Sequence, residues 1–299
     1  MRLIKLRPIT VLNSNVPEEN YETYDPAYAY HAGDIVLVQN LEPNGITKKF
    51  RSLADNNQGH YPPDNPDFWQ DLGATNKWAM FDSYSTTQTV YDGNIQVEIE
   101  ATKITHVALF NVEGNECTIE IWDNDTGDFI NVYDQGLRLD QSLSWSDYFF
   151  GEFVFKTALV QQVPYMLGST RLRITIYGST TKCGLLAVGY GQYIGCTTFG
   201  VRTGIDDYSV KAQLDFGEYY LKQGKFAKKA EVNLEIATGA LSKIQKMLAD
   251  VRATPCIWDL NNENTNEDAL IIYGFYKDFE VILSTPSIST CTLSIEGLI

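Results

Sequence analysis

Apolar and polar residues alternate along several short stretches in the middle of the chain. The alternation is strict over residues 95–100, 117–122 and 171–177. A period of two with one apolar face is typical of strands that lie half-buried on a core. Residues 105–110 and 185–190 are almost continuously apolar, which indicates central strands. Many short strands separated by turns predict an antiparallel β-sandwich, jelly-roll-like, over residues 76–200.

The N-terminal part of the chain shows a different pattern. Residues 1–20 are expected to form an arm with one strand, residues 3–12, whose free backbone groups a neighbouring subunit could pair with. Residues 21–75 are rich in Pro, Gly, Asn and Asp, with short strand patterns at 34–38 and 48–53. Turn-forming residues between short strands predict a small, loop-rich module.

Residues 201–299 combine strand patterns with one helix pattern. Leu241, Ile244, Leu248 and Val251 are spaced by three, four and three residues, which predicts a helix over about 239–252 with one apolar stripe. Thr238 is expected to cap its start. Strands are expected over residues 230–237, 255–260, 269–276, 279–284 and 290–296. The predicted fold is therefore mainly β: an aromatic-rich module, a β-sandwich and a C-terminal α+β sheet with one packed helix.

Composition narrows the classes of function. The 299 residues include 23 Lys and Arg against 38 Asp and Glu, which gives a net charge of −15 and argues against nucleic-acid binding. With 44% hydrophobic residues, disorder is not expected to dominate. No apolar run approaches the ~18 residues of a membrane span, and no signal peptide is recognised, so synthesis in a cytoplasm is expected. The five cysteines are expected to be reduced core residues.

Chemical motifs are scarce. His31, His60 and His106 lie far apart, and no metal-ligand, phosphate-loop or activated-serine motif occurs. The acidic loop at 123–128 has calcium-loop composition, but it is also typical of a β-hairpin turn, which we favour. A carboxylate pair for glycoside hydrolysis cannot be nominated among 38 acidic residues. No cofactor, no metal and no enzyme activity are therefore predicted.

Aromatic residues are concentrated in and directly after the small module. They are Tyr21, Tyr24, Tyr28, Tyr30, Phe50, Tyr61, Phe68, Trp69 and Trp78. Such rings could stack on sugar faces, or they could form the core that a module of about fifty residues needs. As candidate carbohydrate-binding residues we select Tyr30, Phe50, Tyr61, Trp69 and Trp78.

The module resembles small chitin-binding-type carbohydrate-binding modules. The resemblance rests on Tyr30-His31-Ala32-Gly33-Asp34-Ile35-Val36, Phe50, Gly59-His60-Tyr61-Pro62 and Trp69. It implies a sugar-binding scaffold. The pair of exposed tryptophans typical of that family falls near Leu53 and Ala54 here, which favours a scaffold used for another ligand or for docking.

The following block is similar to tail and baseplate proteins of tailed bacteriophages. The similarity rests on the run from Trp69 through Asn76-Lys77-Trp78-Ala79-Met80-Phe81-Asp82, and on segments at 205–217 and 252–279. It implies a self-assembling virion component of the tail tip, baseplate or fibre-attachment region. Its partners would be other tail or baseplate proteins, further copies of itself in a homo-oligomer and, at the host surface, glycan. The alternatives are a receptor-binding protein acting directly on host glycan and, less favoured, a glycan depolymerase.

Overall fold

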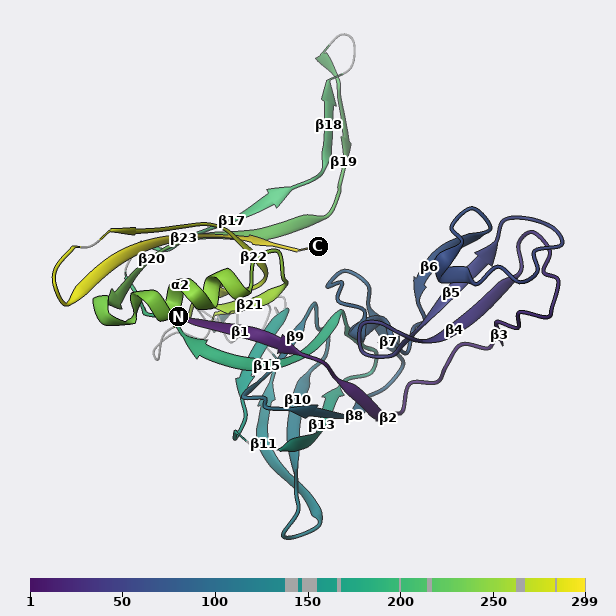
Figure 1. Ribbon diagram of the computed structural model, residues 1–299, viewed down its shortest axis with the longest axis horizontal. Coiled ribbons are helices and arrows are strands. Elements are labelled where there is room, and N and C mark those ends of the chain that lie inside the picture. The colour runs from purple at the N-terminus through teal and green to yellow at the C-terminus, as the bar shows by residue number, and fades with distance from the viewer. Residues whose placement is uncertain are drawn as a thin grey trace. The chain divides into compact units, whose positions relative to one another are not determined.

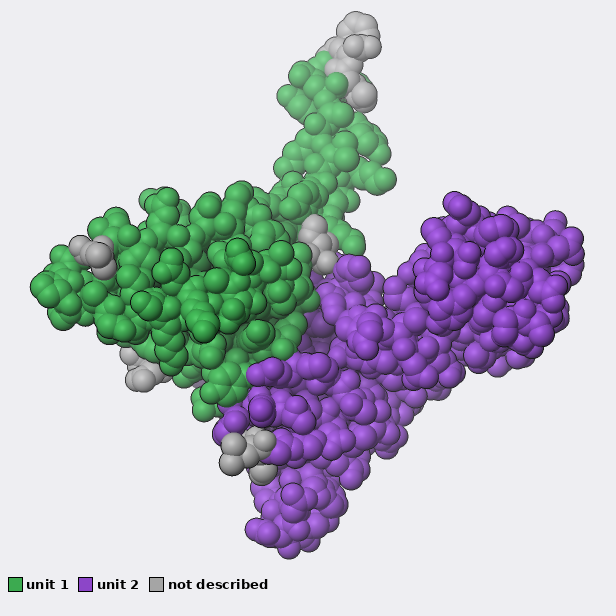
Figure 2. Space-filling model, viewed as in Figure 1, with its two compact units in different colours: residues 1–6, 158–162, 189–299 green, residues 7–157, 163–188 purple. Residues whose placement is uncertain are grey.

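The structure is a computed structural model in which the chain forms a mainly β fold (Figure 1). It describes residues 1–137, 145–146, 155–165, 168–198, 200–213, 217–261, 267–282 and 284–298. The chain divides into two compact units (Figure 2). Unit 1 comprises residues 1–6, 158–162 and 189–299, and unit 2 comprises residues 7–157 and 163–188.

Unit 1 is built on an antiparallel sheet. Its strand order is β1 (Arg2–Arg7), β21 (Cys256–Asp259), β22 (Ile271–Ile282), β23 (Ile288–Gly297) and β20 (Phe226–Ala237). The two halves of β20 also pair with β17 (Arg202–Asp207) and β16 (Cys196–Thr197). Residues 189–193 of β15 (Leu185–Tyr193) continue the sheet beyond β1.

The core of unit 1 lies between this sheet and helix α2 (Leu241–Asp250). Alternate residues of β20 are buried, and Val232 and Leu234 belong to one apolar cluster with Ile244 and Leu248 of α2. Val251 just after the helix is buried in the same cluster. The predicted apolar stripe is confirmed, because its spacing places these side chains on one helix face.

The predicted cap of this helix is wrong. A 3₁₀ turn, Thr238–Ala240, precedes α2, and Ala240 at the N-cap position makes no side-chain capping bond. The Thr238 hydroxyl instead donates to the Thr285 carbonyl and lies 2.9 Å from Ser289 Oγ. Its hydrogen-bonding capacity is therefore used to hold the start of β23 rather than the start of the helix.

Two strand predictions also need correction. The two strands expected at 269–276 and 279–284 are one strand, β22, which spans Ile271–Ile282 and whose register shifts between Tyr276 and Asp278. An irregularity of this kind interrupts the polar–apolar alternation without ending the strand. Residues 3–12 are not one strand with free backbone groups: β1 pairs with β21, and β2 (Thr10–Ser14) pairs with β8.

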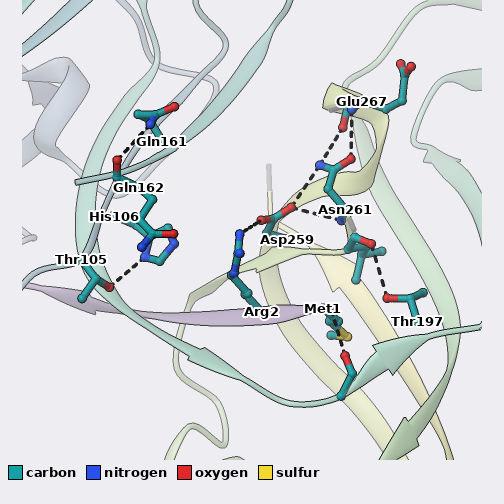
Figure 3. Close-up of polar contacts among 12 residues, drawn as sticks. Met1, Arg2, Thr105, His106, Gln161, Gln162, Thr197, Asp259, Asn261 and Glu267 are labelled. Carbon is teal, nitrogen blue, oxygen red and sulfur yellow. Dashed lines mark hydrogen bonds and ion pairs between the residues drawn. The ribbon is translucent and has the colours of Figure 1, made fainter. Parts of the chain in front are cut away.

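An ion pair at the end of β1 links it to β21. Arg2 Nη1 lies 3.8 Å from the buried Asp259 Oδ2 (Figure 3). Asp259 Oδ1 accepts hydrogen bonds from the backbone and side-chain nitrogens of Asn261, and Asn261 Oδ1 accepts one from the Glu267 backbone. The buried carboxylate thus has the several partners that such a group requires.

Unit 2 contains the predicted β-sandwich. One layer has the order β11 (Asp128–Gly136), β10 (Glu116–Asp123), β13 (Ser169–Tyr177), β8 (Ile95–Thr102) and β2. A second layer includes β9 (His106–Phe110), buried at every residue, and residues 185–188 of β15. A small two-stranded sheet pairs β7 (Thr89–Tyr91) with β14 (Thr181–Cys183). The continuous apolar runs are therefore central strands, as predicted.

The outer face of the five-stranded layer carries a charged cluster centred on Glu98. Glu98 accepts hydrogen bonds from Arg171 (2.6 Å) and Arg173 (2.9 Å), and its side chain is 11% exposed. Burial raises the pKa of the Glu98 carboxyl, but the two guanidinium groups outweigh it and hold this pKa below its ordinary value. Both arginines also lie over the Phe129 ring.

We predict that Glu98→Gln reduces the acid sensitivity of unit 2. A carboxyl whose pKa is lower in the folded state stabilises the fold above the unfolded value of about 4.3, and this contribution disappears as pH falls through the folded pKa. At pH 7 the substitution should cost about 1–3 kcal/mol, because it removes a charged hydrogen-bond acceptor. Urea unfolding at pH 7, 5, 4 and 3 measures both effects.

Glu120→Gln is the matched control, since Glu120 lies 3.7 Å from Arg173 on the neighbouring strand and is more exposed. Glu120→Gln should lower the free energy of unfolding at pH 7 by less than Glu98→Gln does. Parallel stability–pH curves for wild type and Glu98→Gln would contradict the prediction.

We predict that Leu248→Asp destabilises unit 1 by several kcal/mol, because it buries an unpaired charge in the core. Gln245→Asp, at an exposed position of the same helix, should change the unfolding temperature little. Thermal unfolding followed by circular dichroism compares the two variants. Equal unfolding temperatures of the two variants would show that the apolar stripe of the helix is not part of the core.

Candidate functional site

The aromatic-rich module is a four-stranded sheet within unit 2. Its order is β3 (Glu22–Thr23), β4 (Ile35–Leu41), β5 (Ile46–Ser52) and β6 (Trp69–Ala74). A 3₁₀ turn, Pro62–Asp64, lies in the long connection between β5 and β6. Loops make up most of the remaining chain, so the module has few side chains from which to build a core.

Aromatic rings form that core. Tyr30, Phe50 and Trp69 are 5%, 4% and 2% exposed and cluster with Val36 and Val38. The rings of Tyr30 and Trp69 meet edge-on, with centroids 5.2 Å apart. Three of the five predicted carbohydrate-binding residues are thus packed inside the module and are not available to stack on a sugar.

The polar ends of these rings are satisfied within the module. The Trp69 indole N–H donates to the His60 carbonyl (2.8 Å), and the Tyr30 hydroxyl accepts the Asp25 backbone N–H (2.7 Å). Burial raises the pKa of Tyr30. Gly33 has a φ of +98° while its N–H donates to the Ser52 carbonyl, a conformation that favours glycine. The motif residues of the module therefore have structural roles.

Two tyrosines of the same ring cluster reach the surface, and we call them the exposed tyrosine pair, Tyr28 and Tyr61. Their side chains are 55% and 40% exposed. Tyr28 contacts the Tyr30 ring at 4.9 Å between centroids, and Tyr61 contacts the Tyr24 ring at 5.9 Å. Tyr24 and Tyr30 stack on each other. Both surface rings thus rest on the buried aromatic core.

Tyr28 was not selected from the sequence, although Tyr61 was. Tyr28 follows the turn that begins at Asp25, where the Asp25 carboxylate accepts the Ala27 N–H. A turn beginning Asp-Pro could have indicated that a tyrosine two residues later lies on the surface. Tyr28 and Tyr61 belong to the same ring cluster only in the folded module, since they are 33 positions apart in the sequence.

Trp78 lies in the joint between the module and the sandwich, not with the other candidates. It is partly buried, its indole N–H donates to Glu18 Oε2 (2.8 Å), and its ring contacts that of Phe81. Ala79, Met80 and Phe81 beside it are buried. The structure therefore does not bring the five predicted residues together on one surface.

The joint itself is held by hydrogen bonds from several segments. Asn76 exchanges two hydrogen bonds with the Val90 backbone, and its own N–H donates to Glu19 Oε1. Glu19 also accepts a hydrogen bond from Lys49 of β5, at 2.9 Å. Asp82 accepts hydrogen bonds from Tyr84 N and Thr87 Oγ1, although burial raises its pKa.

The described residues include no group of three His, Cys, Asp or Glu arranged to hold a metal ion. The acidic loop is a hairpin turn between β10 and β11, as favoured, and Asp123 accepts hydrogen bonds from Asp125 N and Thr126 Oγ1. All five cysteines are free thiols, and only Cys196 among them is exposed. Burial raises the pKa of Cys117 to about 12, so that thiol is a packing residue.

Among the residues that the structure describes, no helix has the length and apolar character needed to cross a membrane. Comparison of the sequence with protein-family models found no match, and comparison with curated proteins found no significantly similar sequence.

The burial of these rings leads to a stability prediction. Trp69→Ala should cost about 3–5 kcal/mol, because it leaves a cavity in the module core. Tyr61→Ala should cost less than ~1 kcal/mol, since its ring is already partly in water. Urea unfolding of both variants, followed by circular dichroism, measures the difference. Similar losses for the two variants would mean that Tyr61 is a core residue.

Proposed function

We propose that the chain is a structural component of a bacteriophage virion, made in the host cytoplasm and assembled at the tail tip, baseplate or fibre-attachment region. The observation that supports this most directly is the joint around residues 75–82. The sequence block similar to phage tail proteins coincides with buried packing and hydrogen bonds that connect a small module to a sandwich. Buried packing and hydrogen bonds between two parts of a chain are typical of a structural role and do not indicate catalysis.

A second function, contact with host-surface glycan, is supported by the exposed tyrosine pair. Flat aromatic faces at the surface offer stacking area at a low cost in conformational entropy. The neighbouring Gln58 amide, which donates to the Ala27 carbonyl, and the Asp25 carboxylate supply polar groups beside the rings. On this proposal Tyr28 and Tyr61 contact the sugar, while Tyr30, Phe50 and Trp69 support them from below.

The depolymerase alternative has one pair of carboxyl groups to consider. Glu116 and Asp134 share a hydrogen bond that raises the pKa of Glu116. Both side chains are exposed on the strands of the β10–β11 hairpin, whereas glycosidases hold their carboxylates in a substrate-binding cleft. We therefore propose that the chain is not an enzyme.

The virion assignment predicts that the chain is found in purified phage particles. Cells that carry the gene in a complete phage genome should release particles containing the protein at the tail, as measured by mass spectrometry and antibody labelling in electron microscopy. Particles assembled normally without the protein would contradict the assignment.

The glycan assignment is tested separately, on the purified chain. Tyr28→Ser combined with Tyr61→Ser should weaken retention on immobilised host-surface polysaccharide at least tenfold. Tyr84→Ser, at an equally exposed tyrosine of unit 2, should not. Equal retention of all three proteins would remove the tyrosine pair from the proposal. Release of reducing sugar ends by wild type but not by Glu116→Gln would favour the depolymerase.

A further inference from the structure

A two-stranded hairpin stands off the sheet of unit 1 (Figure 1). β18 (Val210–Gln213) and β19 (Tyr219–Lys222) pair with each other, and within the described chain with no other strand. All eight of their residues are exposed. A two-stranded ribbon by itself is marginally stable in water. The hydrogen bonds between β18 and β19 therefore stabilise this hairpin only weakly.

The hairpin and its base are unusually apolar for an exposed ribbon. Seven apolar side chains there are 50–70% exposed: Ile205, Tyr208, Val210, Tyr219, Tyr220, Leu221 and Phe226. Together they leave on the order of 700 Å² of side-chain surface to cover, if aromatic side chains bury 150–250 Å² each. A stable interface covers about 800 Å² per partner. The hairpin and its base together therefore expose nearly the area of one side of such an interface.

The net charge of the hairpin indicates which kind of protein partner could bind to it. Residues 207–226 contain three acidic and three basic residues, so their net charge is zero in a chain of −15. Lys211 is paired with Asp207 at 2.6 Å. A strongly basic partner would find no net attraction there. Another acidic copy of this chain would meet no net repulsion from this element, in contrast to the chain as a whole.

Unit 1 also has a groove of matching character, which we call the β20 groove. It has a volume of about 610 Å³ and is lined by Ile194, Ile236, Ile244 and Met247, with Glu235 and Lys243 beside them. The volume accommodates a pair of large side chains. Glu235 and Lys243 make no ion pair or side-chain hydrogen bond with the described residues.

The wall of this groove is fixed by backbone contacts. The Met1 amine donates to the Gly195 carbonyl (2.9 Å, Figure 3), and Ile194 N donates to the Met1 carbonyl (3.2 Å). Cys196 pairs in register with Glu235. A groove whose wall is already ordered loses little further freedom when it is filled.

The groove and the hairpin lie at opposite ends of the same strand. The hairpin leads into Phe226 at the start of β20, whereas Glu235 and Ile236 near its end line the groove. Ten residues of strand separate Phe226 from Ile236, about 33 Å at ~3.3 Å per residue. The hairpin therefore does not fill the groove of its own chain, but it can reach that of a second copy.

We propose that the hairpin of one copy docks in the β20 groove of the next, with Tyr219 and Leu221 entering it. These two residues lie on the same ribbon face, because side chains two apart on a strand share a face. The contact is head-to-tail, so it builds a ring or an open filament. The inference rests on the proposed self-assembly and specifies its interface.

The test uses two complementary variants of the full chain. Tyr219→Ser combined with Leu221→Ser removes the docking side chains of the hairpin and leaves the groove intact. Met247→Glu places a charge in the groove and leaves the hairpin intact. Each variant alone should lose self-association at least tenfold in analytical ultracentrifugation. An equimolar mixture should form one-to-one pairs that do not grow further, because only one hairpin and one groove remain intact in each pair.

The control variants carry similar substitutions in unit 1, at positions outside the hairpin and the groove. Ile282→Ser removes an equally exposed apolar side chain, and Lys246→Glu reverses a charge on α2 outside the groove. Both should associate as wild type does. Circular dichroism and thermal unfolding verify that all variants fold. Normal self-association of Met247→Glu alone would show that hairpins pair with hairpins, which overturns the proposal.

A monomeric wild type that is nevertheless found in particles overturns this interface while the proposed function stands.

Discussion

The alternation of buried and exposed residues along β20 is the constraint on which unit 1 depends. Val232, Leu234 and Ile236 point to the core because every second side chain shares a face, and α2 covers that face. Toward Phe226 the same strand pairs with β17, and the chain between β17 and β20 forms the separate ribbon of β18 and β19. One twelve-residue strand thus supplies a core, a groove wall and the base of a projecting hairpin.

A related constraint shapes the small module, where core and surface compete for the same residue type. A unit of about fifty residues buries little surface and depends on its largest side chains. Tyr30, Phe50 and Trp69 therefore cannot also be ligand platforms without leaving the core empty. The rings that remain available are those, such as Tyr28 and Tyr61, which contact the cluster at their edges and stay exposed. Aromatic content indicates such a module but does not separate the two roles.

The periodicity of apolar residues predicted the regular strands and the helix. It failed where contacts between distant parts of the chain determine the local structure. Strands such as β8, β10 and β13 follow from strict alternation, and the α2 stripe follows from its three–four spacing. The break in β22 and the use of Thr238 by β23 depend on neighbours distant in sequence. β18 and β19 lack an alternating pattern because neither face of the ribbon is buried, so periodicity gave no sign of them. Of the candidate residues selected within the module, Tyr30, Phe50 and Trp69 are buried and Tyr61 is exposed, because aromatic content and the resemblance identify the module but not which rings stay outside its core.

The exposed hairpin is best explained by the electrostatics of the whole chain. A net charge of −15 keeps separate copies apart at long range, which opposes premature association. An element with zero net charge and a dense set of apolar side chains reverses this preference only at contact distance, where apolar burial acts. The Asp207–Lys211 and Asp206–Lys229 pairs neutralise the base of the hairpin within the chain, so its charges do not need a partner. In the proposed contact, long-range repulsion therefore opposes early association, whereas the exposed apolar side chains of the ribbon favour association once two copies touch.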